Sequence, residues 1–312
     1  MSTQGIPKMN LAPIALFTYN RLHHTRLTIE ALAANELAPE SDLYVFSDAP
    51  RSEAHREAVR EVREFIGSVR GFRTITLVER EENLGLARSI IDGVTRLTDE
   101  RGSVIVLEDD LLTSPFFLRY MNDALALYRD DEQVISIHGY VYPLKERVPE
   151  LFFIRGADCW GWATWKRGWE LFQYDGTALL AELRKRKLER AFNFDNSYPY
   201  IKMLESQVRG DNDSWAIRWN ASAFLNDKLT LYPGRSLVRN IGFDASGFHC
   251  GAIADFDVAL SETPITIERI EVVESAQAKR AFRNFFKGIK TGFWQRQKNS
   301  IRKRINRITR QF

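Results

Sequence analysis

Cysteine is scarce in this sequence: among 312 residues only Cys159 and Cys250 are present. Two thiols exclude a disulfide framework and a zinc site made of four Cys and His ligands at the usual spacings. The sequence also lacks an apolar run long enough to cross a bilayer, and residues 1–5 lack the charged-then-apolar pattern of a secretory leader. These absences predict a cytoplasmic protein.

Glycine-rich phosphate-binding signatures are missing as well. The sequence contains neither G-x-G-x-x-G nor G-x-x-x-x-G-K-[ST]. These patterns hold dinucleotides or nucleoside triphosphates through closely approaching backbone N–H groups. The sequence therefore supports neither a dinucleotide site nor a P-loop mechanism.

Acidic residues are absent from the end of the chain. No Asp or Glu follows Glu274, whereas twelve Lys and Arg residues do. Because the whole chain carries +3, its first 274 residues carry −9. The protein thus combines an acidic body with a strongly basic tail.

The tail over 275–312 has apolar residues at helical spacing, including Phe282, Phe286 and Ile289. A basic amphipathic helix without acids is typical of a segment that lies on an anionic membrane surface, and this predicts a protein peripheral on the inner face of the membrane. An ordinary docked helix and an RNA-binding segment are the alternatives. The many phenylalanines argue against a nucleic-acid partner.

The body alternates short apolar runs with amphipathic segments. Strands are predicted at 13–20, 43–47, 74–78, 103–107, 134–138, 152–155 and 228–232, and helices at 21–35, 52–66, 86–97, 115–128, 177–192, 197–208 and 213–224. Alternating strands and helices imply βαβ units with parallel pairing and right-handed crossovers. The sequence therefore predicts an α/β protein whose sheet is parallel or mixed.

The run at 103–107 ends in three carboxylates, Glu108, Asp109 and Asp110. Open α/β sheets bind ligands at the carboxyl ends of their strands. Adjacent carboxylates repel one another and lose hydration on burial, so a hard divalent cation with bound phosphates would complete the arrangement. The alternative is a solvated acidic turn before a helix.

Tryptophan is concentrated in one short segment. Four of the seven tryptophans lie between Trp160 and Trp169, and Trp162 is among them. Such a run can form an aromatic wall for the apolar face of an acceptor, with Trp160 and Trp162 as the candidate contacts. Core packing is the alternative.

Two further segments carry candidate polar residues. Asp213 or Ser214 precedes a predicted helix, where capping that helix is the structural alternative to a catalytic role. The stretch 233–251, which is rich in Pro and Gly, predicts a loop that carries His249. His249 is a candidate metal ligand or phosphate contact, with a partly buried loop histidine as the alternative.

The order of these features resembles metal-dependent glycosyltransferases of the A-type fold, and most of all the N-acetylglucosaminyltransferase I-like branch and its bacterial relatives, in which Glu-Asp-Asp replaces Asp-x-Asp. The resemblance spans roughly 13–250. Its motifs are Phe17-Thr18-Tyr19-Asn20-Arg21, Asp48, Asn83-Leu84-Gly85, Leu107-Glu108-Asp109-Asp110-Leu111, Gly161-Trp162 and Asp213-Ser214-Trp215. The most specific part is the apolar strand followed by Glu-Asp-Asp-Leu.

The resemblance implies a donor site for a nucleotide sugar, with UDP as the expected nucleotide. Asp110 would bind Mn²⁺ or Mg²⁺ against the diphosphate, while Asp109 and Glu108 would contact the ribose and the sugar. Asp48 would accept from uracil, and Arg21 and Arg88 would contact the diphosphate or the base. Asn20, Asn83 and Gly85 belong to the same implied donor site.

The resemblance also implies the reaction. Asp213 would be the general base, although Ser214 stands where the related enzymes have a second acid, and Asp211 remains a rival. The implied function is inverting sugar transfer to a glycan or lipid-linked acceptor in bacterial surface polysaccharide or lipopolysaccharide synthesis. The alternatives are a sugar nucleotidyltransferase, whose glycine-rich basic signature is missing after 13–20, and a non-catalytic glycan- or membrane-binding protein of the same fold.

The chain is expected to divide into four parts. An N-terminal extension covers 1–12 and a nucleotide-sugar-binding subdomain covers 13–138. An acceptor-binding and catalytic subdomain covers 139–274, and the basic amphipathic tail covers 275–312. The first subdomain is expected to be Rossmann-like, and the central sheet is expected to be mixed.

Overall fold

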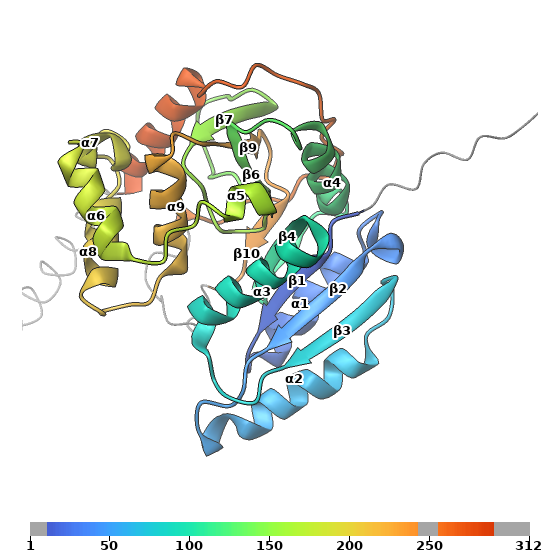
Figure 1. Ribbon diagram of the computed structural model, residues 1–312. Helices are drawn as coiled ribbons and strands as arrows, with labels where there is room; N and C mark the ends of the chain where they lie inside the picture. The colour runs from blue at the N-terminus through green and yellow to red at the C-terminus, as the bar shows by residue number, and fades with distance from the viewer. Residues whose placement is uncertain (1–10, 243–254, 290–312) are drawn as a thin grey trace, which may run out of the picture.

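The computed structural model describes residues 11–242 and 255–289. Eight strands form its central sheet (Figure 1). They are β1 (Ile14–Thr18), β2 (Asp42–Ser47), β3 (Thr74–Glu79), β4 (Ser103–Glu108), β6 (Val134–His138), β7 (Leu151–Arg155), β8 (Trp162–Trp165) and β9 (Leu229–Pro233). Their spatial order is β3-β2-β1-β4-β8-β6-β9-β7. The predicted α/β class with a mixed central sheet is confirmed, and each of the seven predicted strands coincides with an observed one.

One half of the sheet is parallel. β1 pairs in parallel with β2 and with β4, and β2 pairs in parallel with β3. β1 and β2 are buried along their whole length, which explains why their sequences are nearly continuous apolar runs. This register aligns Phe17 with Glu108, so the carboxyl ends of β1 and β4 meet at one edge.

The other half of the sheet begins with a strand that the sequence did not predict. β8 lies antiparallel between β4 and β6 and comes from the tryptophan-rich segment. Ala163 and Trp165 belong to one apolar cluster and Trp162 to the other, as the two-residue period of a strand requires. The tryptophans therefore fill both faces of the sheet.

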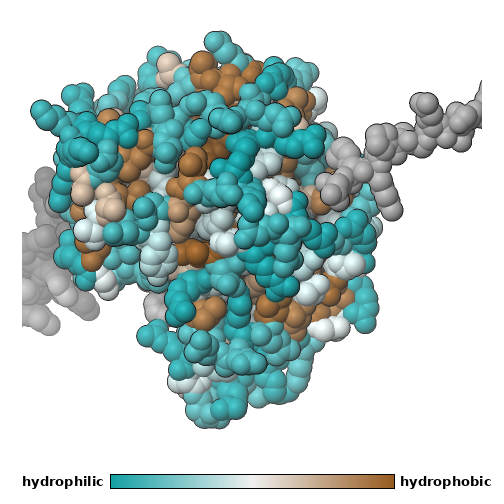
Figure 2. Space-filling view, viewed as in Figure 1, coloured by the Kyte–Doolittle hydropathy of each residue, from teal (hydrophilic) through white to brown (hydrophobic). Residues whose placement is uncertain are grey.

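Helices cover the sheet on both faces. α1 (Leu22–Ala33), α2 (Arg56–Ser68) and α4 (Phe117–Leu127) share an apolar cluster with Ile14 and Leu16 of β1. α3 (Gly85–Arg101), α5 (Lys166–Trp169) and α9 (Trp215–Leu225) share another with Ala15 and Phe17. The face seen in Figure 2 is mainly hydrophilic with separate hydrophobic patches, as expected when helices turn their apolar stripes toward a sheet.

The remaining elements are short. They are α6 (Gly176–Lys185), α7 (Glu189–Phe192), α8 (Tyr200–Val208), the 3₁₀ turns η1 (Ala38–Glu40) and η2 (Glu53–His55), and a ribbon of β5 (Leu111–Thr113) with β10 (Val238–Asn240). The single helix predicted at 177–192 is wrong, because Lys187 adopts a positive φ of 56° between α6 and α7. β5 and β10 were not predicted.

The start of the basic tail is docked on the body. Residues 276–289 are helical, and Phe282 and Phe286 of this helix are buried. The ring of Phe282 lies 5.0 Å from that of Tyr142 and 5.5 Å from that of Tyr232. The prediction that this apolar face lies on a membrane is therefore wrong for 276–289, where the docked-helix alternative holds. Residues 290–312 lie outside the described part of the chain.

The segment before this helix runs along β7. Phe153 and Glu274 form an isolated parallel bridge, and Ser275 N donates to Phe153 O at 2.9 Å. Across 11–242 and 255–289, no helix is long and apolar enough to cross a membrane. The sheet runs without a break through both predicted subdomains, with the boundary at 138 between β6 and β7, so their separate roles stay a prediction.

An ion pair between a buried carboxylate and a partly exposed guanidinium links the two outer parallel strands. Asp42, at the start of β2, accepts hydrogen bonds from Arg73 Nε at 2.8 Å, from Arg73 Nη2 at 2.6 Å and from Thr74 Oγ1 at 2.7 Å. The hydrogen bonds from Arg73, supported by Thr74 against the effect of burial, lower the pKa of Asp42 to about 2. The carboxylate thus ties β2 to the first residue of β3.

We expect Asp42→Asn to lower the free energy of unfolding at pH 7 by about 1–2 kcal/mol, a value reduced because the Arg73 partner is partly exposed and screened. Because the folded-state pKa lies below its ordinary value, the stabilisation is complete at neutral pH and is lost as pH falls from about 5 to 2. Urea denaturation at several pH values measures this difference. Asp99→Asn, at an exposed ion pair with Lys166, is the control and should change little. A deficit that stays constant down to pH 2.5 would contradict the prediction.

Candidate active site

The acid cluster lies where the parallel strands end. Glu108 is the last residue of β4, and Asp109 and Asp110 form the turn into β5. Arg21, between β1 and α1, donates through Nη2 to Asp109 Oδ1 and, at 2.9 Å, to Asp110 Oδ2. Thr28 Oγ1 of α1 donates to Asp109 O at 2.9 Å. The register of β1 and β4 therefore brings Arg21 to the carboxylates. The sequence analysis placed these residues in one donor site but did not predict the ion pairs between them.

Burial dominates the electrostatics of this cluster. Burial raises the pKa of Glu108, and the charges of Asp110 and Asp109 raise it further. Burial likewise raises the pKa of Asp109, although the charge of Arg21 opposes this. Burial by itself would lower the pKa of Arg21, but the two aspartates outweigh it and the pKa is raised. Three carboxylates thus share one guanidinium, and the cluster favours additional positive charge.

The donor set fits a hard divalent cation. Within 11–242 and 255–289 no group of three His, Cys, Asp or Glu side chains is placed to hold a metal ion. Mg²⁺ is commonly bound by one or two carboxylates that substrate phosphates complete, and Mn²⁺ also prefers such oxygen ligands. Asp109 and Asp110 converge on one cationic atom, so they can supply these two carboxylates. The other predicted ligand, His249, lies outside the described residues.

Gly242 packs against the carboxylate of Asp110. A Cβ at this position would lie 2.1 Å from Asp110 Oδ2, so only glycine leaves room for the side chain. Ile241 N also donates to Asp110 O at 2.8 Å, which fixes the end of β10 beside the cluster. The sequence reasoning missed this contact, although the glycine does stand in the segment predicted as a loop.

The second predicted group assembles at the end of β2. Asp48 accepts from Leu84 N at 2.9 Å and from Gly85 N at 2.8 Å, while Asn83 Nδ2 donates to Ala49 O at 2.7 Å. Gly85 has a positive φ of 73°, which explains the glycine. Asp48 is buried beneath these contacts. Its carboxylate caps the start of α3, and the contact with uracil stays a prediction.

Asn20 lies on the connection between β1 and α1, and Arg88 lies at the start of α3. Asn20 is half-buried directly before Arg21, and Arg88 is exposed on the first turn of α3. Their side chains are thus placed near the carboxyl ends of β1 and β2. Their predicted contacts with the donor remain untested.

The two candidate acceptor tryptophans differ. Trp162 is fully buried, with its ring 5.4 Å from that of Trp215 and 5.6 Å from that of Trp219. Its prediction as an acceptor contact is wrong, because it packs the core between β8 and α9. Trp160 is partly exposed and lies 4.8 Å from the Tyr140 ring, so its role stays a prediction.

Both candidate bases lie between α8 and α9. Asp213 is 63% exposed and pairs with the buried Arg218 at 2.9 Å. Ser214 Oγ accepts from Ile217 N at 3.3 Å, so Ser214 and not Asp213 caps α9. Asp211 pairs with Arg209 at 2.8 Å at the end of α8. Asp213 is thus anchored by a buried arginine and Asp211 by an exposed one, and the choice between the two as the base stays a prediction.

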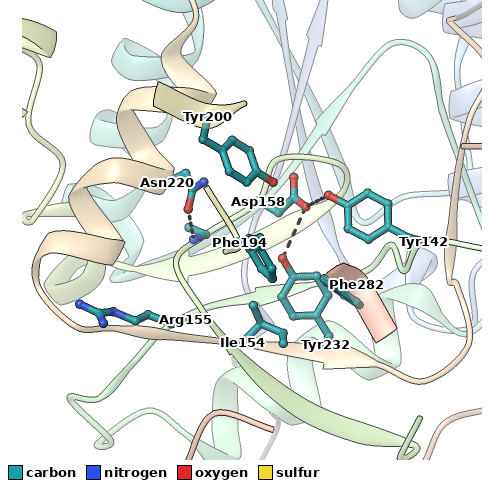
Figure 3. A pocket seen from close by; sticks show the side chains of 10 residues that line it. Tyr142, Ile154, Arg155, Asp158, Phe194, Tyr200, Asn220, Tyr232 and Phe282 are labelled. Carbon is teal, nitrogen blue, oxygen red and sulfur yellow. Dashed lines mark hydrogen bonds between the residues drawn. The ribbon is translucent and has the colours of Figure 1, made fainter. Parts of the chain in front are cut away.

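Asp158 is a residue that the sequence analysis did not single out. Its Oδ2 accepts from the hydroxyl of Tyr142 at 2.9 Å and from that of Tyr232 at 3.4 Å, and Figure 3 shows these side chains around one small pocket. The empty space there, including the solvent at its mouth, is about 240 Å³. Tyr142 and Tyr232 lie 16 and 74 positions from Asp158 in the sequence, so no local pattern indicated these contacts.

The loop that carries Asp158 also approaches the acid cluster. Burial raises the pKa of the Cys159 thiol, and the negative charges of Asp158, Glu108 and Asp110 add to this. The Cys159 thiol therefore lies within electrostatic range of both Asp158 and the acid cluster.

No protein-family profile and no curated protein matches this sequence. Among solved structures, the chain is similar to the mannosyltransferase PcManGT from Pyrobaculum calidifontis in complex with GDP-Man and Mn²⁺, at 15% identity and a TM-score of 0.37, over 69% of this chain and 68% of that one. It is also similar to S. aureus TarS, at 15% identity and a TM-score of 0.32, over 47% of this chain and 24% of that one.

A structure of S. aureus TarS 1-349 is matched at 12% identity and a TM-score of 0.34, over 57% of this chain and 49% of that one. The chain thus spans about a quarter of the first TarS structure and about half of the second. At these identities the similarity concerns the fold alone. The roles of the site residues stay predictions.

We expect Gly242→Ala to displace the Asp110 carboxylate, because the new methyl group would lie 2.1 Å from Oδ2. The side chain can rotate away, so the melting temperature should change little, while the affinity for Mn²⁺ with UDP present should fall about tenfold. Calorimetric titration and thermal melting measure the two effects. Gly67→Ala, where a Cβ meets nothing within 4 Å, is the matched control. Unchanged affinity in a folded variant would contradict the prediction.

Proposed function

We propose that this chain is a metal-dependent glycosyltransferase that moves a sugar from a nucleoside-diphosphate donor, UDP-linked, to a hydroxyl of a glycan or lipid-linked acceptor. The observation that carries the proposal is the cluster of Glu108, Asp109 and Asp110 at the carboxyl end of β4, linked by Arg21 to the end of β1. Acceptors of bacterial surface polysaccharide or lipopolysaccharide synthesis belong to the proposed class.

The donor would bind across the ends of β1, β2 and β4. Asp110, with Asp109, would hold Mn²⁺ or Mg²⁺, which as a Lewis acid stabilises the charge that develops on a leaving diphosphate. Glu108 lies beside these ligands and would accept from donor hydroxyls. Arg21 and Arg88 would supply positive charge to the diphosphate.

The acceptor would be activated by a carboxylate. Asp213 would take the proton of the acceptor hydroxyl, and Arg218 would hold its carboxylate in place. A positioned base of this kind contributes about 10²–10⁴-fold. One base opposite the leaving diphosphate predicts direct displacement with inversion at the sugar carbon. Trp160 remains the candidate aromatic contact for the acceptor.

Calorimetric titration of UDP and GDP, with and without Mn²⁺, tests the donor site. We expect the wild type to bind UDP only when Mn²⁺ is present, and Asp110→Ala to weaken this binding by about 100-fold, because a metal ligand is lost. Asp99→Ala, at an exposed ion pair on α3, is the control and should bind like the wild type. UDP binding that needs neither the metal nor Asp110 would refute the proposed mechanism.

We expect Asp213→Asn to lower kcat by about 10²–10⁴-fold without weakening UDP binding, because the amide cannot accept the proton. Steady-state kinetics with an acceptor that the wild type glycosylates measures kcat. Calorimetric titration with UDP measures the affinity for the nucleotide. Asp211→Asn is the comparison, and its kcat should stay near that of the wild type. If kcat fell in Asp211→Asn and not in Asp213→Asn, the base would be Asp211.

A further inference from the structure

Arg21 stands where a metal ion would have to bind. Its Nη2 atom alone bonds both aspartates that would ligate the metal. The side chain of Asp109 is 6% exposed and that of Asp110 is 15% exposed, so few of their oxygens face bulk water. A divalent cation and the guanidinium therefore compete for the same carboxylate oxygens.

We propose that Arg21 is an exchangeable counterion of Asp109 and Asp110. It neutralises the aspartates while the donor site is empty, and it moves to a diphosphate oxygen when nucleotide and divalent cation enter together. This inference rests on the proposed function and adds to it a coupling between the binding of the metal and the binding of the nucleotide. Arg21 is in this view a positioning residue for the metal ligands and a binding residue for the donor.

The backbone of Arg21 is fixed while its side chain is free to exchange. Arg21 O accepts from Thr25 N at 2.9 Å, which anchors the residue at the start of α1. Within the described residues, the guanidinium hydrogen-bonds only to Asp109 and Asp110. A long side chain on a fixed backbone can change partners without a change of fold.

The exchange is chemically balanced in charge. A buried carboxylate pair that lost the guanidinium bonded to both aspartates would be strongly destabilised, so Arg21 can leave only when a metal ion replaces it. A metal ion that entered alone would in turn leave the Arg21 guanidinium without its carboxylate partners. A diphosphate offers Arg21 the same planar, charge-assisted hydrogen bonds that a carboxylate does. Nucleotide and metal therefore assist each other, and by linkage the effect is reciprocal.

The test compares Arg21→Gln with the wild type. Electron paramagnetic resonance of free Mn²⁺ measures metal binding without nucleotide, and calorimetry measures UDP binding with and without Mn²⁺. We expect Arg21→Gln to bind Mn²⁺ alone about tenfold more tightly, and the enhancement of UDP binding by Mn²⁺ to fall about tenfold. Arg96→Gln, at the exposed ion pair with Glu100, is the matched control and should leave both values unchanged.

The outcomes separate this inference from the proposed function. A folded Arg21→Gln protein that binds Mn²⁺ no more tightly than the wild type would overturn the exchange, even if UDP still binds with Mn²⁺. If the variant does not fold, the wild type decides, since independent binding of Mn²⁺ and UDP would also overturn the exchange. Absence of any UDP or GDP binding to the wild type, with or without Mn²⁺, would overturn the proposed function and the exchange with it.

Discussion

The need to neutralise three carboxylates at one strand end constrains the rest of this structure. β4 lies at the centre of the sheet, and its carboxyl end is covered by neighbouring loops, so Glu108, Asp109 and Asp110 cannot all be hydrated freely. The nearest cation reaches them from β1, because the parallel register places the end of β1 beside that of β4. The strand pairing and the ion pairs therefore depend on each other.

The same constraint explains how segments from distant parts of the chain gather at this edge. The ribbon of β5 and β10 returns the chain to Asp110, where Gly242 leaves just enough room for the carboxylate. The loop with Asp158 and Cys159 adds further negative charge nearby. The Asp158 carboxylate increases the demand for positive charge, and the ribbon is held beside Asp110 by pairing between segments that are distant in the sequence.

Sequence reasoning identified what local pattern encodes. The apolar run before Glu108 predicted both the strand and the position of the acids, and Asp48 with Asn83 and Gly85 proved to be one hydrogen-bonded group. Trp162 was misjudged because the burial of an indole depends on partners such as Trp219, which lies 57 positions later in the chain. Asp158 and Gly242 were missed for the same reason, because their partners are also distant in the sequence.

The tail shows another limit of local pattern. A basic helix with one apolar face has the same periodicity whether lipid or protein covers that face, and only the aromatic surface around Tyr142 decides for 276–289. β8 was missed because four residues, Trp-Ala-Thr-Trp, are too few to show the alternation of a strand, and its pairing partners in β4 and β6 are distant in the sequence. In both places the decisive contacts are distant in sequence.

The pairing of Glu274 and Ser275 with Phe153 has a consequence for the solution behaviour of the molecule. β7 is the last strand of the sheet, and an open strand edge of this kind is a template for self-association. The segment ahead of the C-terminal helix occupies part of that edge, and Glu274 Oε1 also accepts from Arg155 N at 3.2 Å. The beginning of the basic tail therefore protects the sheet against aggregation, whatever the remainder of the tail binds.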